Sequence, residues 1–125
     1  MKIRIQGNSI RARLSRSEVA RLSTGDSVHQ ETKFASSSRL VCIVIPTEDV
    51  TTATASFDNA TIAIALPRKH VTVWANSDQV GLEGEVQIDE KDSLRLLIEK
   101  DFECLHSRTD DADDAFPHPL AQQKR

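Results

Sequence analysis

Basic side chains crowd the first residues of this 125-residue chain and are the first feature with a recognisable chemistry. Residues 1–17 contain no acid but five cations, namely Lys2, Arg4, Arg11, Arg13 and Arg16. Guanidinium and ammonium groups bind phosphate and carboxylate oxygens through charge-assisted hydrogen bonds. The sequence therefore gives five candidate anion-binding residues: Lys2, Arg4, Arg11, Arg13 and Lys33.

Acidic residues gather at the opposite end of the chain. Between residues 99 and 119 only Lys100 and Arg108 offset seven carboxylates, namely Glu99, Asp101, Glu103, Asp110, Asp111, Asp113 and Asp114. An acidic segment can imitate a phosphorylated ligand. Two interpretations stay open: both charged segments are solvated surface, or residues 108–119 fold across the basic start and neutralise Arg4, Arg11 and Arg13.

Motifs for catalysis or metal binding are sparse. The four glycines are scattered and form no phosphate-binding loop, and there is no nucleophile elbow. Cys104 and His106 offer two metal ligands, but structural zinc sites usually use more sulfur. We therefore assign no catalytic residue, metal or cofactor. The sequence favours a protein without enzymatic activity.

An internal duplication organises the chain that must position these residues. Residues 3–34 align with residues 55–86 at an offset of 52, with seven identical pairs. The identities include apolar positions such as Leu14 and Leu66, and Leu22 aligns with Trp74. Periodicity of this kind indicates a repeated structural unit.

Each copy reads as a hairpin, a short helix and two further strands. Gly7-Asn8 and Asp58-Asn59 are turn signals, and Ser15 with Glu18 forms a capping box at the start of a helix. Strands follow at residues 27–34 and 40–45, and at 80–88 and 94–102. The predicted fold is an α+β domain built from a duplicated ββαββ unit, mainly antiparallel, with about eight strands in a single wide sheet or a closed barrel.

Strand alternation sorts the charged side chains onto one face. Lys2, Arg4, Arg11 and Arg13 share one face of the first hairpin, while its isoleucines and Leu14 share the other. In a closed barrel the charged face would line a polar tunnel, together with Glu31, Lys33, Glu83 and Glu85. In an open sheet it would meet water.

Composition limits the partners. The net charge of −3 and pI of 5.8 disfavour duplex DNA, and the few aromatic residues disfavour a stacking platform for single strands. The apolar runs are too short for a membrane span, and two cysteines are too few for a disulfide framework. We expect a cytoplasmic protein with one domain, residues 1–105 (repeats 2–46 and 53–105), and a loosely ordered acidic tail, residues 106–125.

Two resemblances add expectations. The opening residues 1–11, the stretch 98–105 and the closing residues 116–119 resemble a family of small bacterial proteins without an assigned activity. The duplicated arrangement of strands and helices is similar to that of the triphosphate tunnel (CYTH-like) enzymes. That resemblance implies a metal-dependent triphosphate hydrolase, although residues 2–6 lack the acidic residues of that family's first-strand motif.

Three functions follow as hypotheses. The first is a non-catalytic module that binds a phosphorylated anion or an acidic protein through the basic hairpin. The second is the CYTH-like triphosphate hydrolase. The third is a structural protein that pairs with another subunit through an exposed sheet edge.

Overall fold

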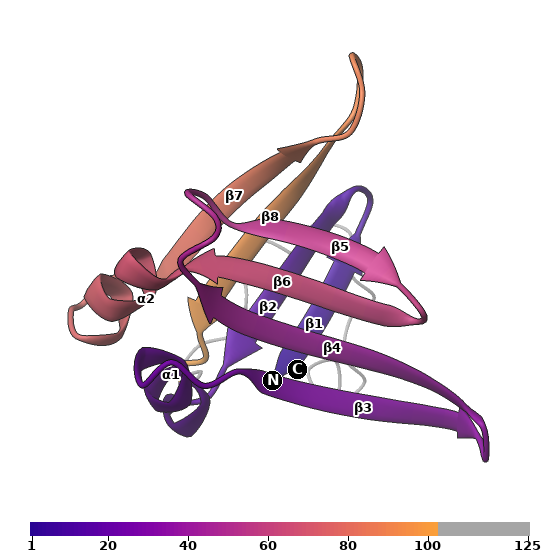
Figure 1. Ribbon diagram of the computed structural model, residues 1–125, viewed down its shortest axis with the longest axis horizontal. Helices are drawn as coiled ribbons and strands as arrows, with labels where there is room; N and C mark the ends of the chain where they lie inside the picture. The colour runs from indigo at the N-terminus through magenta and orange to yellow at the C-terminus, as the bar shows by residue number, and fades with distance from the viewer. Residues whose placement is uncertain (103–125) are drawn as a thin grey trace, which may run out of the picture.

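The structure, a computed structural model, describes residues 1–102 and confirms the duplicated unit (Figure 1). The first copy contains β1 (Lys2–Gln6), β2 (Ser9–Leu14), α1 (Arg16–Ser23), β3 (Val28–Ala35) and β4 (Ser38–Thr47). The second copy contains β5 (Thr54–Asp58), β6 (Thr61–Pro67), α2 (Arg68–Ala75), β7 (Gly81–Gln87) and β8 (Ser93–Lys100). The predictions about the acidic tail lie outside the described residues.

Local sequence signals set the hairpins and helices as predicted. Gly7 takes a positive φ of 54° in the first hairpin turn, a backbone conformation that glycine adopts without steric strain. The second hairpin turns at Asn59 and Ala60, one residue later than predicted, with φ of 51° and 55°. These positions lie 52 residues after Gly7 and Asn8, so the duplication preserves the spacing of the turn.

A capping box begins α1. The Glu18 backbone N–H donates to Ser15 Oγ at 3.3 Å, and the Ser15 N–H donates to Glu18 Oε1 at 2.8 Å. The other carboxylate oxygen accepts from the Met1 ammonium at 2.9 Å. Partial burial raises the pKa of Glu18, but these hydrogen bonds and the ammonium charge outweigh it and lower the pKa overall. The second helix starts after Pro67 without a side-chain cap.

The strands form two sheets of four, with the orders β1-β2-β8-β7 and β3-β4-β6-β5. Each sheet takes one hairpin from each repeat, so neither repeat completes a sheet alone. In Figure 1 the second sheet lies across the first, and both helices lie at one end of the pair. The two repeats are therefore interlocked.

The mainly antiparallel α+β fold is confirmed, but the strands form two sheets rather than the single wide sheet or closed barrel that the sequence left open. The two strand pairs that join the repeats, β2 with β8 and β4 with β6, are parallel. Each hairpin pairs antiparallel because a short turn joins its strands. The joining pairs bring together strands from different repeats, so no turn in the sequence sets their direction.

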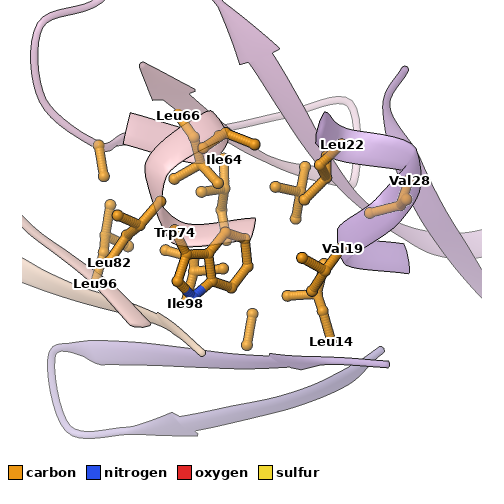
Figure 2. Close-up of a cluster of buried hydrophobic side chains, with 14 of the residues drawn as sticks. Leu14, Val19, Leu22, Val28, Ile64, Leu66, Trp74, Leu82, Leu96 and Ile98 are labelled. Atoms are coloured by element: carbon orange, nitrogen blue, oxygen red, sulfur yellow. The ribbon is translucent and has the colours of Figure 1, made fainter. Parts of the chain in front are cut away.

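The core lies between the two sheets and under the two helices (Figure 2). Both sheets point an apolar face inward, and α1 and α2 add Val19, Leu22, Val71 and Trp74. Trp74 is fully buried among side chains that include Leu14, Ile64 and Ile98, and its Nε1 donates to the Val80 carbonyl at 3.0 Å. Two sheets packed through such faces bury their apolar residues without closing a barrel.

The cysteine within residues 1–102 is buried. Cys42 lies in the core on the inner strand β4, and burial raises the pKa of its thiol. Within the described part of the chain, neither helix has the length and apolar character needed to cross a membrane.

Candidate functional site

Strand register assembles one charged surface on the outward side of the first sheet. Across β1 and β2, Lys2 lies opposite Arg13 and Arg4 lies opposite Arg11, which confirms the predicted shared face. We call these four side chains the basic face. Directly opposite side chains on one face of an antiparallel pair lie within about 5.5 Å of each other at their β-carbons. Four cations are thus concentrated on two short strands.

The parallel pairing of β2 with β8 extends this surface. It sets Arg13 beside Glu99 and Arg11 beside Leu97, and β7 adds Glu83 next to Leu97. The next row places Arg95 between Ser9 and Glu85. Neighbouring strands are about 4.8 Å apart, and β8 lies between β2 and β7. The backbone of β7, which carries the carboxylates, is therefore about 10 Å from the backbone of β2, which carries the arginines. The surface is basic along one side and acidic along the other.

A buried carboxylate holds two of the arginines. Glu99 is 8% exposed, and its Oε1 accepts hydrogen bonds from Arg11 Nε at 2.7 Å and Arg13 Nε at 3.0 Å. The side chains of Arg11 and Arg13 retain 32% and 20% exposure. One carboxylate therefore orders two cations, and the trio carries a formal charge of +1 at the surface.

The outer end of the basic face carries a further ion pair. Lys2 Nζ lies 2.9 Å from Asp101 Oδ2, and the Lys2 side chain is 74% exposed. The hydrogen bond from Lys2 lowers the pKa of Asp101 and outweighs the opposing effect of desolvation, and the charge of Lys2 lowers this pKa further. An exposed pair of this kind adds little to stability.

The charged surface is hollowed. A concavity of about 710 Å³ is lined by Arg4 and Arg11 on the hairpin side, by Arg95 on β8 and by Glu83 and Glu85 on β7. Its volume falls in the range of ordinary small-molecule sites. The lining is predominantly polar and charged, so it suits a charged ligand better than an apolar one.

The second sheet offers an internal comparison, because the repeat relates its outer face to that of the first. The positions 52 residues after Lys2, Arg4, Arg11 and Arg13 are Thr54, Ser56, Ala63 and Ala65. Where β8 places Glu99 beside Arg13 in the first sheet, β4 places Ile45 beside Ala65 in the second sheet. The same fold thus forms with small and apolar residues at these positions, so the architecture itself does not require the arginines.

Lys33, the fifth candidate, is not part of the basic face. It lies on β3 in the second sheet, opposite Arg39 on β4. Its neighbour on that face, Glu31, pairs with Arg39 at 3.1 Å. The alternation of residues along β3 was visible in the sequence, but the sheet to which β3 belongs was not.

Sequence reasoning missed two residues of the surface, Glu99 and Arg95. Both lie on β8, and they meet the hairpin only through the parallel pairing with β2. The alternation of residues 94–99 shows that Arg95, Leu97 and Glu99 share a face. It does not show which strand they border, so the two residues could not be joined to the basic face.

The sheet topology contradicts the predicted polar tunnel. A tunnel requires a closed barrel, whereas the strands form two separate sheets. Glu83 and Glu85 lie exposed on the edge strand β7. Within residues 1–102, no group of three or more histidine, cysteine or acidic side chains is arranged to hold a metal ion. The suggested Cys104 and His106 ligands lie outside the described residues.

The edge-pairing hypothesis stays a prediction. Strands β1 and β3 each stand at one end of a sheet order. An edge strand presents backbone groups that can pair with another chain, and charged side chains oppose such pairing. Lys2 and Arg4 lie on β1, so any pairing partner of this strand would meet two cations.

Comparisons with known proteins give one match. The model of a family of unknown function, DUF7009, matches residues 1–120. No curated protein and no solved structure matches the chain.

Proposed function

Because this chain belongs to DUF7009, a family of unknown function, we propose its function from the geometry: it is a non-catalytic module that binds a phosphorylated anion on the basic face. The contrast between the two sheets carries this proposal. One outer face concentrates Arg11 and Arg13 around the buried Glu99, and the equivalent face has Ala63, Ala65 and Ile45.

The chemistry of the arginines favours phosphate. A guanidinium presents several N–H donors in one plane and matches the oxygens of phosphate or carboxylate. The Nε donors of Arg11 and Arg13 bind Glu99, which fixes both side chains before a ligand arrives. Such preorganisation reduces the ordering cost of binding. Arg4 and Arg95 line the adjoining concavity and would contact the remainder of an extended anion.

We expect tripolyphosphate to raise the melting temperature of the protein by several degrees, whereas sulfate at matched ionic strength raises it much less. A ligand at 100 times its dissociation constant stabilises the native state by about 2.7 kcal/mol. The measurement is a thermal-shift titration of the full chain, with and without magnesium. If tripolyphosphate and sulfate raise the melting temperature equally, the basic face is an ordinary solvated surface and not an anion-binding site.

The same surface would also accept an acidic protein segment, because carboxylates bind arginine through the same hydrogen bonds. A competition experiment separates the two sources of anion. We expect inorganic tripolyphosphate to displace a fluorescent poly-aspartate peptide from the protein. Binding of the peptide that tripolyphosphate leaves unchanged would assign the site to acidic proteins.

A further inference from the structure

The concavity beside the basic face carries opposite charges on its two sides. Arg11 on β2 lines one side, and Glu83 and Glu85 on the edge strand β7 line the other. Strand β8 lies between these strands and keeps their backbones about 10 Å apart (Figure 1). A ligand that fills the concavity therefore meets a guanidinium at one end and carboxylates at the other.

An apolar side chain separates the two charged sides. Leu97 on β8 lies in register between Arg11 and Glu83, is partly buried and lines the concavity. It offers no hydrogen bond to a charged group, whereas the methylene groups of a ligand gain by packing on it. The middle of the concavity thus favours an apolar spacer between two charged ends.

The two glutamates have exposed side chains, and within residues 1–102 neither of them takes part in an ion pair. Arg95 lies beside Glu85 in register but does not pair with it. Two carboxylates and one arginine give this side of the concavity a formal charge of −1. A purely anionic ligand would be repelled here, and a cationic group would be attracted.

The second sheet shows that the fold can pair a glutamate at this place. By strand register, Glu31 on β3 is the counterpart of Glu85 on β7. Glu31 pairs with Arg39 on β4 at 3.1 Å. The counterpart of Arg39 on β8 is Ser93, which carries no charge. The missing cation beside Glu85 therefore comes from a difference in residues and is not imposed by the architecture.

We propose that the phosphorylated anion bound at the basic face also carries an amine, which Glu83 and Glu85 bind on the far side of Leu97. The ligand class is an alkyl phosphate whose terminal ammonium lies roughly 10 Å from the phosphate, the separation of β2 and β7. This inference rests on the proposed function and adds the substrate class. The phosphate binds the arginines, the methylene groups pack on Leu97, and the ammonium binds the glutamates.

The test compares 6-aminohexyl phosphate with 6-hydroxyhexyl phosphate, which differ only in the terminal group. Calorimetry on the full chain is expected to show about fivefold tighter binding of the amino compound, the effect of an exposed ion pair. In the variant Glu83→Gln, Glu85→Gln this preference should vanish, and the hydroxy compound should bind more tightly because two repelling carboxylates are gone.

A charge-matched control is the variant Glu48→Gln, Glu90→Gln, which removes two exposed carboxylates that do not line the concavity. It should keep the preference for the amino compound. Far-UV circular dichroism verifies that both variants are folded. Tripolyphosphate, titrated in the same buffer, tests the proposed function separately.

The other outcomes contradict the inference in distinguishable ways. If tripolyphosphate binds but the two hexyl phosphates bind equally or not at all, the inference is wrong and the proposed function stands. A preference that persists after Glu83→Gln, Glu85→Gln, or that the control variant also loses, would show that these two glutamates do not bind the amine. If neither tripolyphosphate nor either hexyl phosphate binds, both the inference and the proposed function are wrong.

Discussion

Replacing Trp74 by alanine lowers the free energy of unfolding by about 3–5 kcal/mol, a large part of the stability of an ordinary domain. Trp74 is fully buried between α2 and the inward faces of the sheets, so its removal leaves a cavity at the centre of the core (Figure 2). The substitution also removes the hydrogen bond from Nε1 to the Val80 carbonyl. Urea unfolding followed by circular dichroism measures the loss.

Two further variants separate the causes of this loss. Trp74→Phe keeps most of the apolar volume and loses the hydrogen bond, and we expect a smaller decrease of about 1–2 kcal/mol. Val73→Ala alters an exposed neighbour on the same helix and should change stability by less than about 0.5 kcal/mol. A Trp74→Ala protein as stable as the Val73→Ala protein would contradict the described core.

Replacing Glu99 by glutamine lowers the free energy of unfolding by about 1–3 kcal/mol, because Arg11 and Arg13 lose the carboxylate that they share. The partial exposure of both arginines keeps the loss below that of a fully buried ion pair. Sulfate should recover part of the lost stability, since an anion then supplies the missing negative charge. Urea unfolding in sulfate and in chloride at equal ionic strength measures both effects.

Asp101→Asn is the matched control, because it also removes one carboxylate that pairs with the basic face. Its partner Lys2 is highly exposed, so we expect no measurable change in stability. If Glu99→Gln behaves like Asp101→Asn, or if sulfate and chloride act equally on it, then Glu99 does not organise the arginines.

The sequence was most informative where the structure depends on local contacts. Gly7 at the first hairpin turn and the Ser15–Glu18 capping box act within a few residues, and both appear where predicted. The duplication added further support, because Leu14 and Leu66 are both fully buried at equivalent positions. The predicted two helices and eight strands follow from signals of this kind.

What the sequence did not predict depends on contacts between distant residues. Arg11 and Glu99 are 88 residues apart and meet only because β2 and β8 pair in parallel. No turn fixes the relative direction of these two strands. The alternation of residues along a strand shows which side chains share a face, but it does not show which strand lies alongside. The cluster of Arg11, Arg13 and Glu99, and the position of Arg95 in the concavity, could therefore be found only in the structure.

The central claim is that the basic face binds an anion. Its most direct test replaces the cluster of Arg11, Arg13 and Glu99 by the residues at the equivalent positions of the second sheet. The variant combines Arg11→Ala, Arg13→Ala and Glu99→Ile, the counterparts being Ala63, Ala65 and Ile45. Replacing a buried ion cluster by apolar residues is often neutral for stability, so the variant should fold. Lys33→Gln, which makes the same change of one unit in net charge on the other sheet, is the control.

The quantity to measure is the affinity for tripolyphosphate by calorimetry, after far-UV circular dichroism has verified that both variants are folded. We predict that the cluster variant loses at least about tenfold in affinity, because two charge-assisted contacts are removed, while Lys33→Gln binds like the unmodified protein. A folded cluster variant that binds tripolyphosphate as tightly as the unmodified protein would contradict an anion site on the basic face.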